Sequence, residues 1–165
     1  MIEKKEIDLK TIVKLCERAI TKDIWYDDSE CTKRFKLEFS QFAEELGYRV
    51  QPNQQNQTEF LTIDMVWWSN GRMVAAIEHE NVPRTDPIAD EWKKLAYVDA
   101  DYRMLISYCS RGDLRKDWLR RASEIISKNP RGKEAHFYLL LGDETLWGFR
   151  GYEFDNSGKL MARYR

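Results

Sequence analysis

Two neighbouring segments of strongly β-forming sequence carry acidic residues where a strand normally carries apolar ones. FLTIDMVWW, residues 60–68, places Asp64 inside an apolar run, and RMVAAIEHE, residues 72–80, ends with Glu78 and Glu80. Asp has a poor strand propensity and a carboxylate is costly to bury, so these positions suggest a functional role. Carboxylate oxygens are ligands that Mg²⁺ and Mn²⁺ prefer, and such an ion activates water and neutralises charge on a phosphate.

The pairing register of the two segments decides whether these carboxylates share a face. The two glutamates are two residues apart and therefore point to one side of their strand. A two-residue turn at Asn70 and Gly71 would oppose Asp64 to Ile77 on the other side, whereas a loop of three or five residues places all three acids together. Only the longer loop collects the odd-numbered apolar residues on one face. We therefore predict that no two-residue turn forms, although Asn-Gly is typical of one.

Converging acids repel one another unless a cation lies among them, which predicts a divalent-metal site. The alternative is a charged strand face that simply meets solvent. Val66, Trp68 and Val74 would share that face, however, and they argue against full exposure. His79 would point to the opposite, apolar face, where a core histidine is favoured over a catalytic base.

Periodic segments on either side supply the elements that must position these residues. Helices are predicted over 6–20 and 30–46, the second with Phe35, Phe39 and Phe42 at helical spacing. The later elements are a strand at 48–50, the strands at 60–68 and 72–80, a helix from Asp86 to about residue 98, a strand at 103–108, a helix over 113–128, and strands at 136–142 and 145–154. This order predicts an α/β fold, with one mixed sheet and helices on its faces.

Length and composition bound the class of protein. A chain of 165 residues that is 42% hydrophobic fits a single domain over 1–165. No apolar run approaches the ~20 residues of a membrane helix, and the first residues lack the pattern of a signal peptide, so a cytoplasmic protein without a membrane partner is expected. Cys16, Cys31 and Cys109 are odd in number and widely spaced, which predicts buried thiols.

Charge is unevenly distributed although the net charge is only −1. Residues 51–110 carry nine acidic and five basic side chains, whereas residues 111–165 carry eight acidic and twelve basic ones. A basic segment beside an acidic centre suits a polyanion held over a metal site. The candidates for contacts with backbone phosphates are Arg115, Lys116, Arg120 and Arg121. A solvated helix face is the alternative interpretation of this segment.

Asp64, a strand-to-strand hairpin and the run Glu78-His79-Glu80 together resemble the signature of the PD-(D/E)XK nuclease superfamily. The resemblance implies a restriction-endonuclease-like core of order αβββαβ over about 30–109. An extra N-terminal helix and a C-terminal helix plus β-hairpin would flank this core. It also implies that Asp64 and Glu78 bind the metal. Glu80 stands where the motif has lysine.

The missing motif lysine has candidates on the following helix. Lys93 and Tyr97 are spaced like the Q-x-x-x-Y motif of some members, with lysine in place of glutamine. In other branches of the superfamily a lysine is supplied from this helix, so Lys93 is the first candidate and Lys94 the second. A solvated surface lysine is the alternative for Lys93.

The resemblance implies a metal-dependent nucleic-acid phosphodiester hydrolase, with DNA as the expected substrate and a homodimer as an open option. Asp64, Glu78 and Glu80 would hold Mg²⁺ or Mn²⁺, and Lys93 would orient water or stabilise charge on the phosphate. The rival interpretation is a catalytically lapsed nuclease-fold module that binds nucleic acid or a protein partner, as the absent motif lysine favours. A third is another α+β sandwich with structural acids, which a two-residue hairpin turn would favour.

Overall fold

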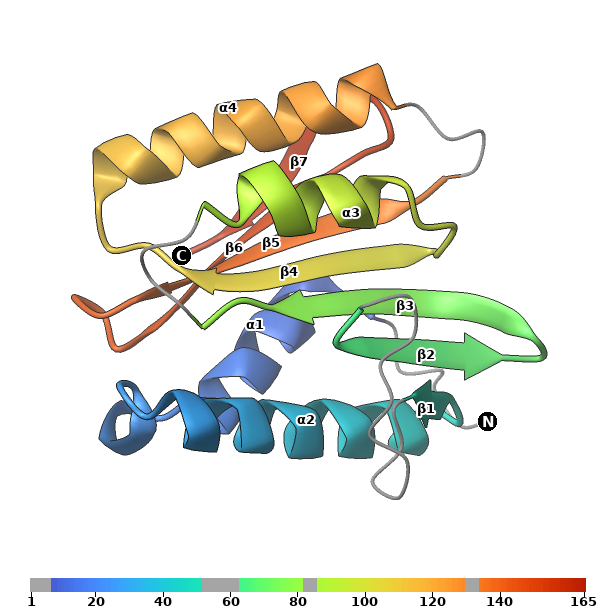
Figure 1. Ribbon diagram of the computed structural model, residues 1–165, viewed down its shortest axis with the longest axis horizontal. Helices are drawn as coiled ribbons and strands as arrows, with labels where there is room; N and C mark the ends of the chain where they lie inside the picture. The colour runs from blue at the N-terminus through green and yellow to red at the C-terminus, as the bar shows by residue number, and fades with distance from the viewer. Residues whose placement is uncertain (1–6, 52–62, 82–85, 130–133) are drawn as a thin grey trace.

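The computed structural model describes residues 7–51, 63–81, 86–129 and 134–165 (Figure 1). Its elements are α1 (Leu9–Ala19), η1 (Lys22–Ile24), α2 (Asp28–Glu45), β1 (Arg49–Gln51), β2 (Met65–Ser69), β3 (Arg72–His79), η2 (Ile88–Trp92), α3 (Lys93–Ala96), β4 (Tyr102–Tyr108), α4 (Gly112–Lys128), β5 (His136–Asp143), β6 (Gly148–Phe154) and β7 (Leu160–Tyr164). The short η1 is a 3₁₀ turn, and η2 is a π-helical segment that continues directly into α3.

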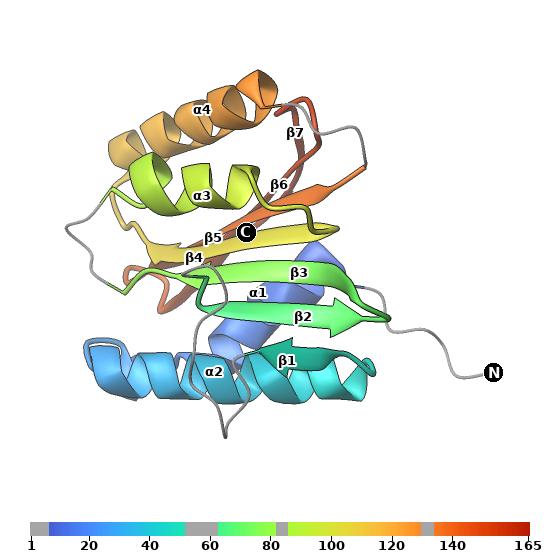
Figure 2. The same ribbon diagram turned by 45° about the vertical axis from the view of Figure 1, so that its right-hand side comes forward.

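The seven strands form one sheet, in which they lie side by side in chain order. The pairs β3–β4 and β4–β5 are parallel, and all other pairs are antiparallel. Helices α1 and α2 lie on one side of the sheet, and α3 and α4 lie on the other (Figures 1 and 2). The predicted mixed sheet with helices on both faces is confirmed. The strand β7 was not predicted, and the connection between β5 and β6 spans 144–147 instead of the predicted 143–144.

Each face of the sheet has its own apolar core. The helix stripe of Phe35, Phe39 and Phe42 is buried against the strands on the side of α1 and α2. On the other side, Trp92 of η2 and Trp118 of α4 pack with residues of β4, β5 and β6. The aromatic side chains on each face fix the position of the helices on the sheet, because close packing leaves few alternative arrangements.

The structure also shows the state of the three cysteines and the character of the helices. Cys16, Cys31 and Cys109 are free and buried, as predicted. None of the helices in the described parts of the chain combines the length and the apolar composition that a bilayer crossing requires.

The hairpin between β2 and β3 closes through a two-residue turn, so the prediction against such a turn is wrong. Asn70 and Gly71 have φ values of 50° and 75°, and Ser69 pairs with Arg72 across them. Positive φ at both central residues matches the turn that follows the right-handed twist of the strands. Asn and Gly tolerate this conformation, which explains why the Asn-Gly pair prevailed.

A β-bulge then changes the register part-way along the hairpin. Trp68 pairs with Met73, but Trp67 pairs with Ala75, so Val74 is an additional residue on β3. An additional residue of this kind bends the strand and shifts every later pair by one position. Beyond the bulge, the register is the one that collects the odd-numbered apolar residues on one face of the hairpin. The turn itself follows from the conformational preference of Asn70 and Gly71.

Beyond the bulge, Met65 pairs with Ile77. Asp64 lies one residue before β2, and the same register continued to it would oppose Asp64 to Glu78. The bulge therefore gives the even pairing sum that the apolar pattern favoured, although the turn has two residues, and the shared carboxylate site stays a prediction.

Candidate active site

Glu78 lies near the end of β3 with only 3% of its surface exposed. Val66 and Ala76, which share its strand face, belong to the apolar core between the sheet and the helices α3 and α4. A carboxylate at such a position is costly unless it gains a charged or hydrogen-bonding partner. The neighbouring helix supplies that partner.

Lys94 of α3 places its Nζ atom 2.5 Å from Oε1 of Glu78 and 2.6 Å from Oε2 of Glu91. Burial works against the charge of Lys94, but its hydrogen bonds to the two glutamates raise its pKa, so the ammonium stays charged. Burial raises the pKa of Glu78 to about 8 against the effect of the Lys94 hydrogen bond, and the negative charge of Asp64 raises it further. Glu78 therefore holds a proton for much of the time at neutral pH.

The π-helical segment η2 and the helix α3 position this lysine. Asp86 begins the segment as predicted, because its Oδ1 accepts hydrogen bonds from the backbone N–H groups of Ile88 and Ala89. Trp92 anchors it to α4 by donating from Nε1 to the carbonyl oxygen of Ala122 at 3.2 Å. A π-helical turn inside a helix is rare and is often found at functional sites.

Asp64 is half-buried next to the start of β2, and its Oδ2 accepts a hydrogen bond of 2.8 Å from the backbone N–H of His79. This bond fixes the Asp64 carboxylate to β3 one residue beyond Glu78. The negative charge of Asp64 contributes to the raised pKa of Glu78, after the larger effect of burial. The structure thus brings together two of the three predicted acids.

Glu80 is placed differently from the other two acids. It is half-buried, and its backbone N–H donates to the carbonyl oxygen of Ile106 at 2.9 Å, which continues the parallel pairing of β3 with β4. Within 7–51, 63–81, 86–129 and 134–165, no group of three or more Asp, Glu, His or Cys side chains is arranged to hold a metal ion. A metal-binding role for Glu80 stays a prediction.

Of the two candidate lysines, it is the second that contacts the acids. Lys93 is exposed on the helix surface, as is Tyr97. Lys94, one position later, lies beside the buried Leu95 and Ala96 and reaches Glu78. The Q-x-x-x-Y spacing favoured Lys93, whereas the lysine that contacts Glu78 is Lys94, which was the second candidate.

Glu91 is a candidate site residue that the sequence analysis missed. It lies three residues before Lys94 and shares its ammonium group with Glu78. The signal that could have identified it is the Glu-x-x-Lys spacing, which places both side chains on one side of a helix. Glu91 adds a second carboxylate from the helix side of the site.

His79 is a core histidine, as predicted. Its ring lies 4.6 Å from that of Phe35, and its Nε2 is 2.9 Å from the hydroxyl of Tyr108. Burial lowers the pKa of His79 to about 3, so the imidazole is neutral at physiological pH. It contributes its backbone N–H to Asp64 while its ring packs on the opposite face of the sheet.

The basic segment of α4 is largely neutralised by acids of the same chain. Arg115 donates to the buried Asp143, and Arg120 forms ion pairs with Asp117 and Glu124. Arg121 forms ion pairs with Asp86 and Asp117. Lys116 is exposed. A phosphate would have to compete with these carboxylates for three of the four predicted contacts, so their part in nucleic-acid binding stays a prediction.

Neither a scan of protein-family models nor a search of curated proteins found a match to this chain. The resemblance to PD-(D/E)XK nucleases therefore depends on the motif residues and on the order of elements. The chemistry of the site has to be argued from Asp64, Glu78, Glu91 and Lys94 themselves.

Proposed function

We propose that this protein is a metal-dependent phosphodiester hydrolase that acts on nucleic acid, with DNA as the expected substrate. The observation that carries the proposal is the ammonium group of Lys94 2.5 Å from the Glu78 carboxylate, with the Asp64 carboxylate bound to the backbone N–H of His79, the next residue of β3. Two acids and a lysine are the residue types that the motif requires. The order α2, β1, β2, β3, η2/α3, β4 agrees with the αβββαβ core that the resemblance implies.

The donor set suits Mg²⁺ or Mn²⁺. Asp64 and Glu78 offer hard carboxylate oxygens, and these two residues would hold the ion. When bound, the ion would supply an activated water and would neutralise charge on the phosphate. Because burial raises the pKa of Glu78 to about 8, this carboxyl group has to release a proton before it can act as a ligand.

Lys94 supports the proposal through its own charge and reach. Its side chain is 29% exposed, so the ammonium group lies at the boundary between the buried acids and solvent. From there it can donate to a phosphate oxygen and stabilise the negative charge that develops during hydrolysis. Glu91, the second partner of Lys94, would hold the ammonium group in position.

The cleavage assay tests the proposal with a matched pair of variants. Purified protein is incubated with single-stranded and duplex DNA in Mg²⁺ or Mn²⁺, with a chelator as the negative control. Lys94→Met should lower the cleavage rate by about 10²–10³, the usual cost of losing one electrostatic contribution to the transition state. Lys93→Met, one residue away and exposed, should cost far less. The reverse order would make Lys93 the motif lysine.

A second candidate function is a lapsed nuclease-fold module that binds nucleic acid or a protein partner. The observation that favours it is the neutralisation of Arg115, Arg120 and Arg121 by acids of the same chain, together with Glu80 at the position of the motif lysine. Binding of nucleic acid without cleavage in either metal would support this candidate and reject the enzyme.

A further inference from the structure

A cleft of about 450 Å³ opens at the sheet edge where β4 and β5 end. Its lining includes aromatic, carboxylate and amide side chains, which come from the segment before α2, from the first residue of α2 and from the ends of β3, β4 and β5: Trp25, Tyr26, Asp28, Asn81, Tyr108 and Glu144. Arg111 also lines the cleft, and its guanidinium group is paired with Asp113 at 2.6 Å. A volume of this size falls in the range of sites for small organic groups. The carboxylates Asp64 and Glu78 are not part of the lining, so the cleft is a separate feature.

Aromatic rings form the wall of the cleft. Trp25 and Tyr108 meet edge to face, with ring centroids 5.5 Å apart, and Tyr26 is 74% exposed at the rim. The absence of a side chain at Gly142 permits this arrangement, because a Cβ atom there would lie 2.6 Å from Cδ1 of Tyr108. Trp25 is buried at 7% exposure, so the accessible ring is that of Tyr26, and an accessible ring is a surface on which planar bases stack with little sequence preference.

Carboxylates define which planar group fits. Asp28 and Glu144 both line the cleft, and the hydroxyl of Tyr26 donates to Oε2 of Glu144 at 2.7 Å. A carboxylate repels a phosphate but accepts a hydrogen bond from an exocyclic amino group such as that of cytosine. The cleft therefore suits a base that carries an amino group.

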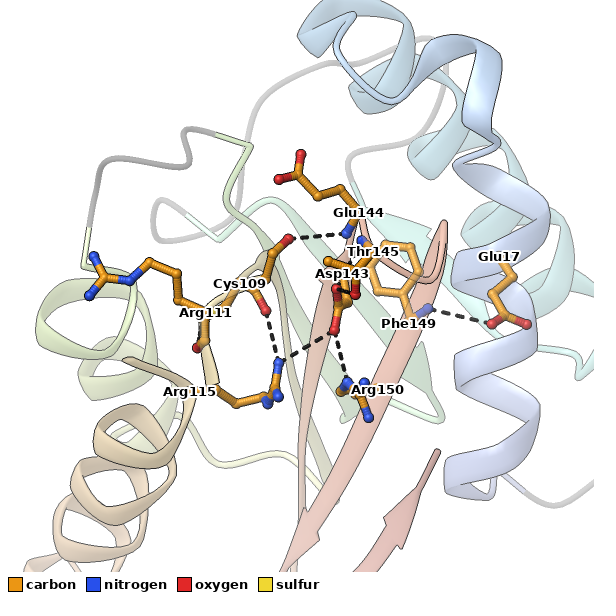
Figure 3. A network of polar contacts seen from close by, with 10 residues as sticks. Glu17, Cys109, Arg111, Arg115, Asp143, Glu144, Thr145, Phe149 and Arg150 are labelled. Atoms are coloured by element: carbon orange, nitrogen blue, oxygen red, sulfur yellow. Dashed lines mark hydrogen bonds and ion pairs between the residues drawn. The ribbon is translucent and has the colours of Figure 1, made fainter. Parts of the chain in front are cut away.

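Hydrogen bonds tie together the two loops that border the cleft (Figure 3). The backbone N–H of Glu144 donates to Oγ of Ser110 at 3.1 Å, and Arg115 donates to the carbonyl oxygen of Cys109 at 3.3 Å. The same arginine also donates to the buried Asp143. The loops are thereby held in one arrangement before any ligand binds, which lowers the entropic cost of binding.

The cleft lies within reach of the candidate active site. Asn81 follows Glu78 by three residues, a distance of about 10 Å along an extended chain. The pairing of His79 with Ile106, continued by two residues, brings Asn81 level with Tyr108. One strand of nucleic acid can therefore reach from the acids to the cleft.

We propose that the cleft binds one unpaired, amino-bearing base of the nucleic-acid strand whose phosphate lies at Asp64 and Glu78. This inference rests on the proposed nuclease function and specifies its substrate, because a base held in the cleft cannot be paired at the same time. The substrates would be single strands, or duplexes with an unpaired nucleotide next to the cleavage position.

Fluorescence anisotropy in a chelator tests the inference without cleavage. The probes are a short labelled deoxycytidine strand, a thymidine strand of equal length, and an abasic strand with the same number of phosphates. We expect the deoxycytidine strand to bind about tenfold more tightly than the abasic strand, as stacking of one base allows. The thymidine strand should bind with intermediate affinity, because its base stacks but lacks the amino group.

Two variants and one control assign this preference to the cleft. Tyr26→Ala should bring the deoxycytidine strand to the affinity of the abasic strand, and Glu144→Ala, which removes the acceptor oxygens, should remove the advantage of deoxycytidine over thymidine. Both side chains are exposed, so neither change should unfold the protein. Met161→Ala, at an exposed position on β7, should leave all three affinities unchanged.

Equal affinity for the deoxycytidine and abasic strands, or no binding of either, would overturn the inference. Cleavage of DNA together with such a result would leave the nuclease function standing without the base site. A base preference that Tyr26→Ala removes, in a protein that never cleaves with Mg²⁺ or Mn²⁺, would keep the base site and reject the nuclease function.

Discussion

At the scale of single residues, the main feature is a carboxyl group that is kept out of water beside an ammonium group. Glu78 has 3% exposure, and burial raises its pKa to about 8 even though Lys94 contacts it directly. A purely structural role would be served as well by an apolar residue, because a buried ion pair seldom adds stability over a hydrophobic replacement. Strongly perturbed acids of this kind are enriched at functional sites.

Glu78 and its neighbour His79 predict how stability depends on pH. The folded pKa of Glu78, about 8, lies above its ordinary value of 4.5, so the folded state holds a proton that the unfolded state releases. Stability should therefore fall as pH rises from 6.5 towards 8, by up to about 1.4 kcal/mol for each pH unit. The folded pKa of His79 is lowered to about 3, so this residue acts only below pH 6.5, where it reduces stability as pH falls.

Urea unfolding of the wild type and of Glu78→Gln between pH 6.5 and 8 measures this effect. The variant cannot titrate at this position, so its free energy of unfolding should be nearly constant over the interval. A slope in Glu78→Gln equal to that of the wild type would show that another group is responsible.

At the scale of elements, two irregularities position the site. The bulge at Val74 allows a two-residue turn and the Met65–Ile77 pairing to exist in the same hairpin. The π-helical segment η2 places Glu91 and Lys94 over the end of β3. Both irregularities are of kinds that are found near functional sites in other proteins.

The turn before the bulge leads to a prediction on two glycines. Gly71 has a φ of +75° and open space around its Cα, so Gly71→Ala should cost about 1–2 kcal/mol of stability through backbone strain alone. Gly112, the first residue of α4, has an ordinary φ and room for a methyl group, so Gly112→Ala should be neutral or slightly stabilising. Urea unfolding of both variants provides the comparison, and equal effects would contradict the proposed turn geometry.

The same elements show which features the sequence could predict. The stripe of Phe35, Phe39 and Phe42 located α2, and the cap at Asp86 located the start of η2, because both signals are local. The bulge was not predictable, because an additional residue in a strand leaves no compositional signal. The strand β7 was missed because it is an edge strand of alternating partial exposure and lacks a strong apolar pattern.

At the scale of the whole molecule, the sheet separates the apolar core around α1 and α2 from the side that carries the Glu78–Lys94 pair. The face covered by α1 and α2 is an aromatic and aliphatic core that includes Phe35. The ring of His79 packs against Phe35 at the edge of this core. On the other face, which α3 and α4 cover (Figure 1), Glu78 near the end of β3 contacts Lys94 of α3. The ion pairs of Arg115 with Asp143 and of Arg120 with Glu124 became visible only in the three-dimensional structure.

The central claim is that Asp64 and Glu78 hold a divalent metal ion. The most direct measurement is an anomalous-difference map from a crystal soaked in Mn²⁺ above pH 8, where Glu78 has lost its proton. We expect a peak between the two carboxylates, with metal–oxygen distances near the ~2.1 Å typical of such ions, and no peak in Glu78→Gln. A map of the wild type without a peak between Asp64 and Glu78 would contradict the claim.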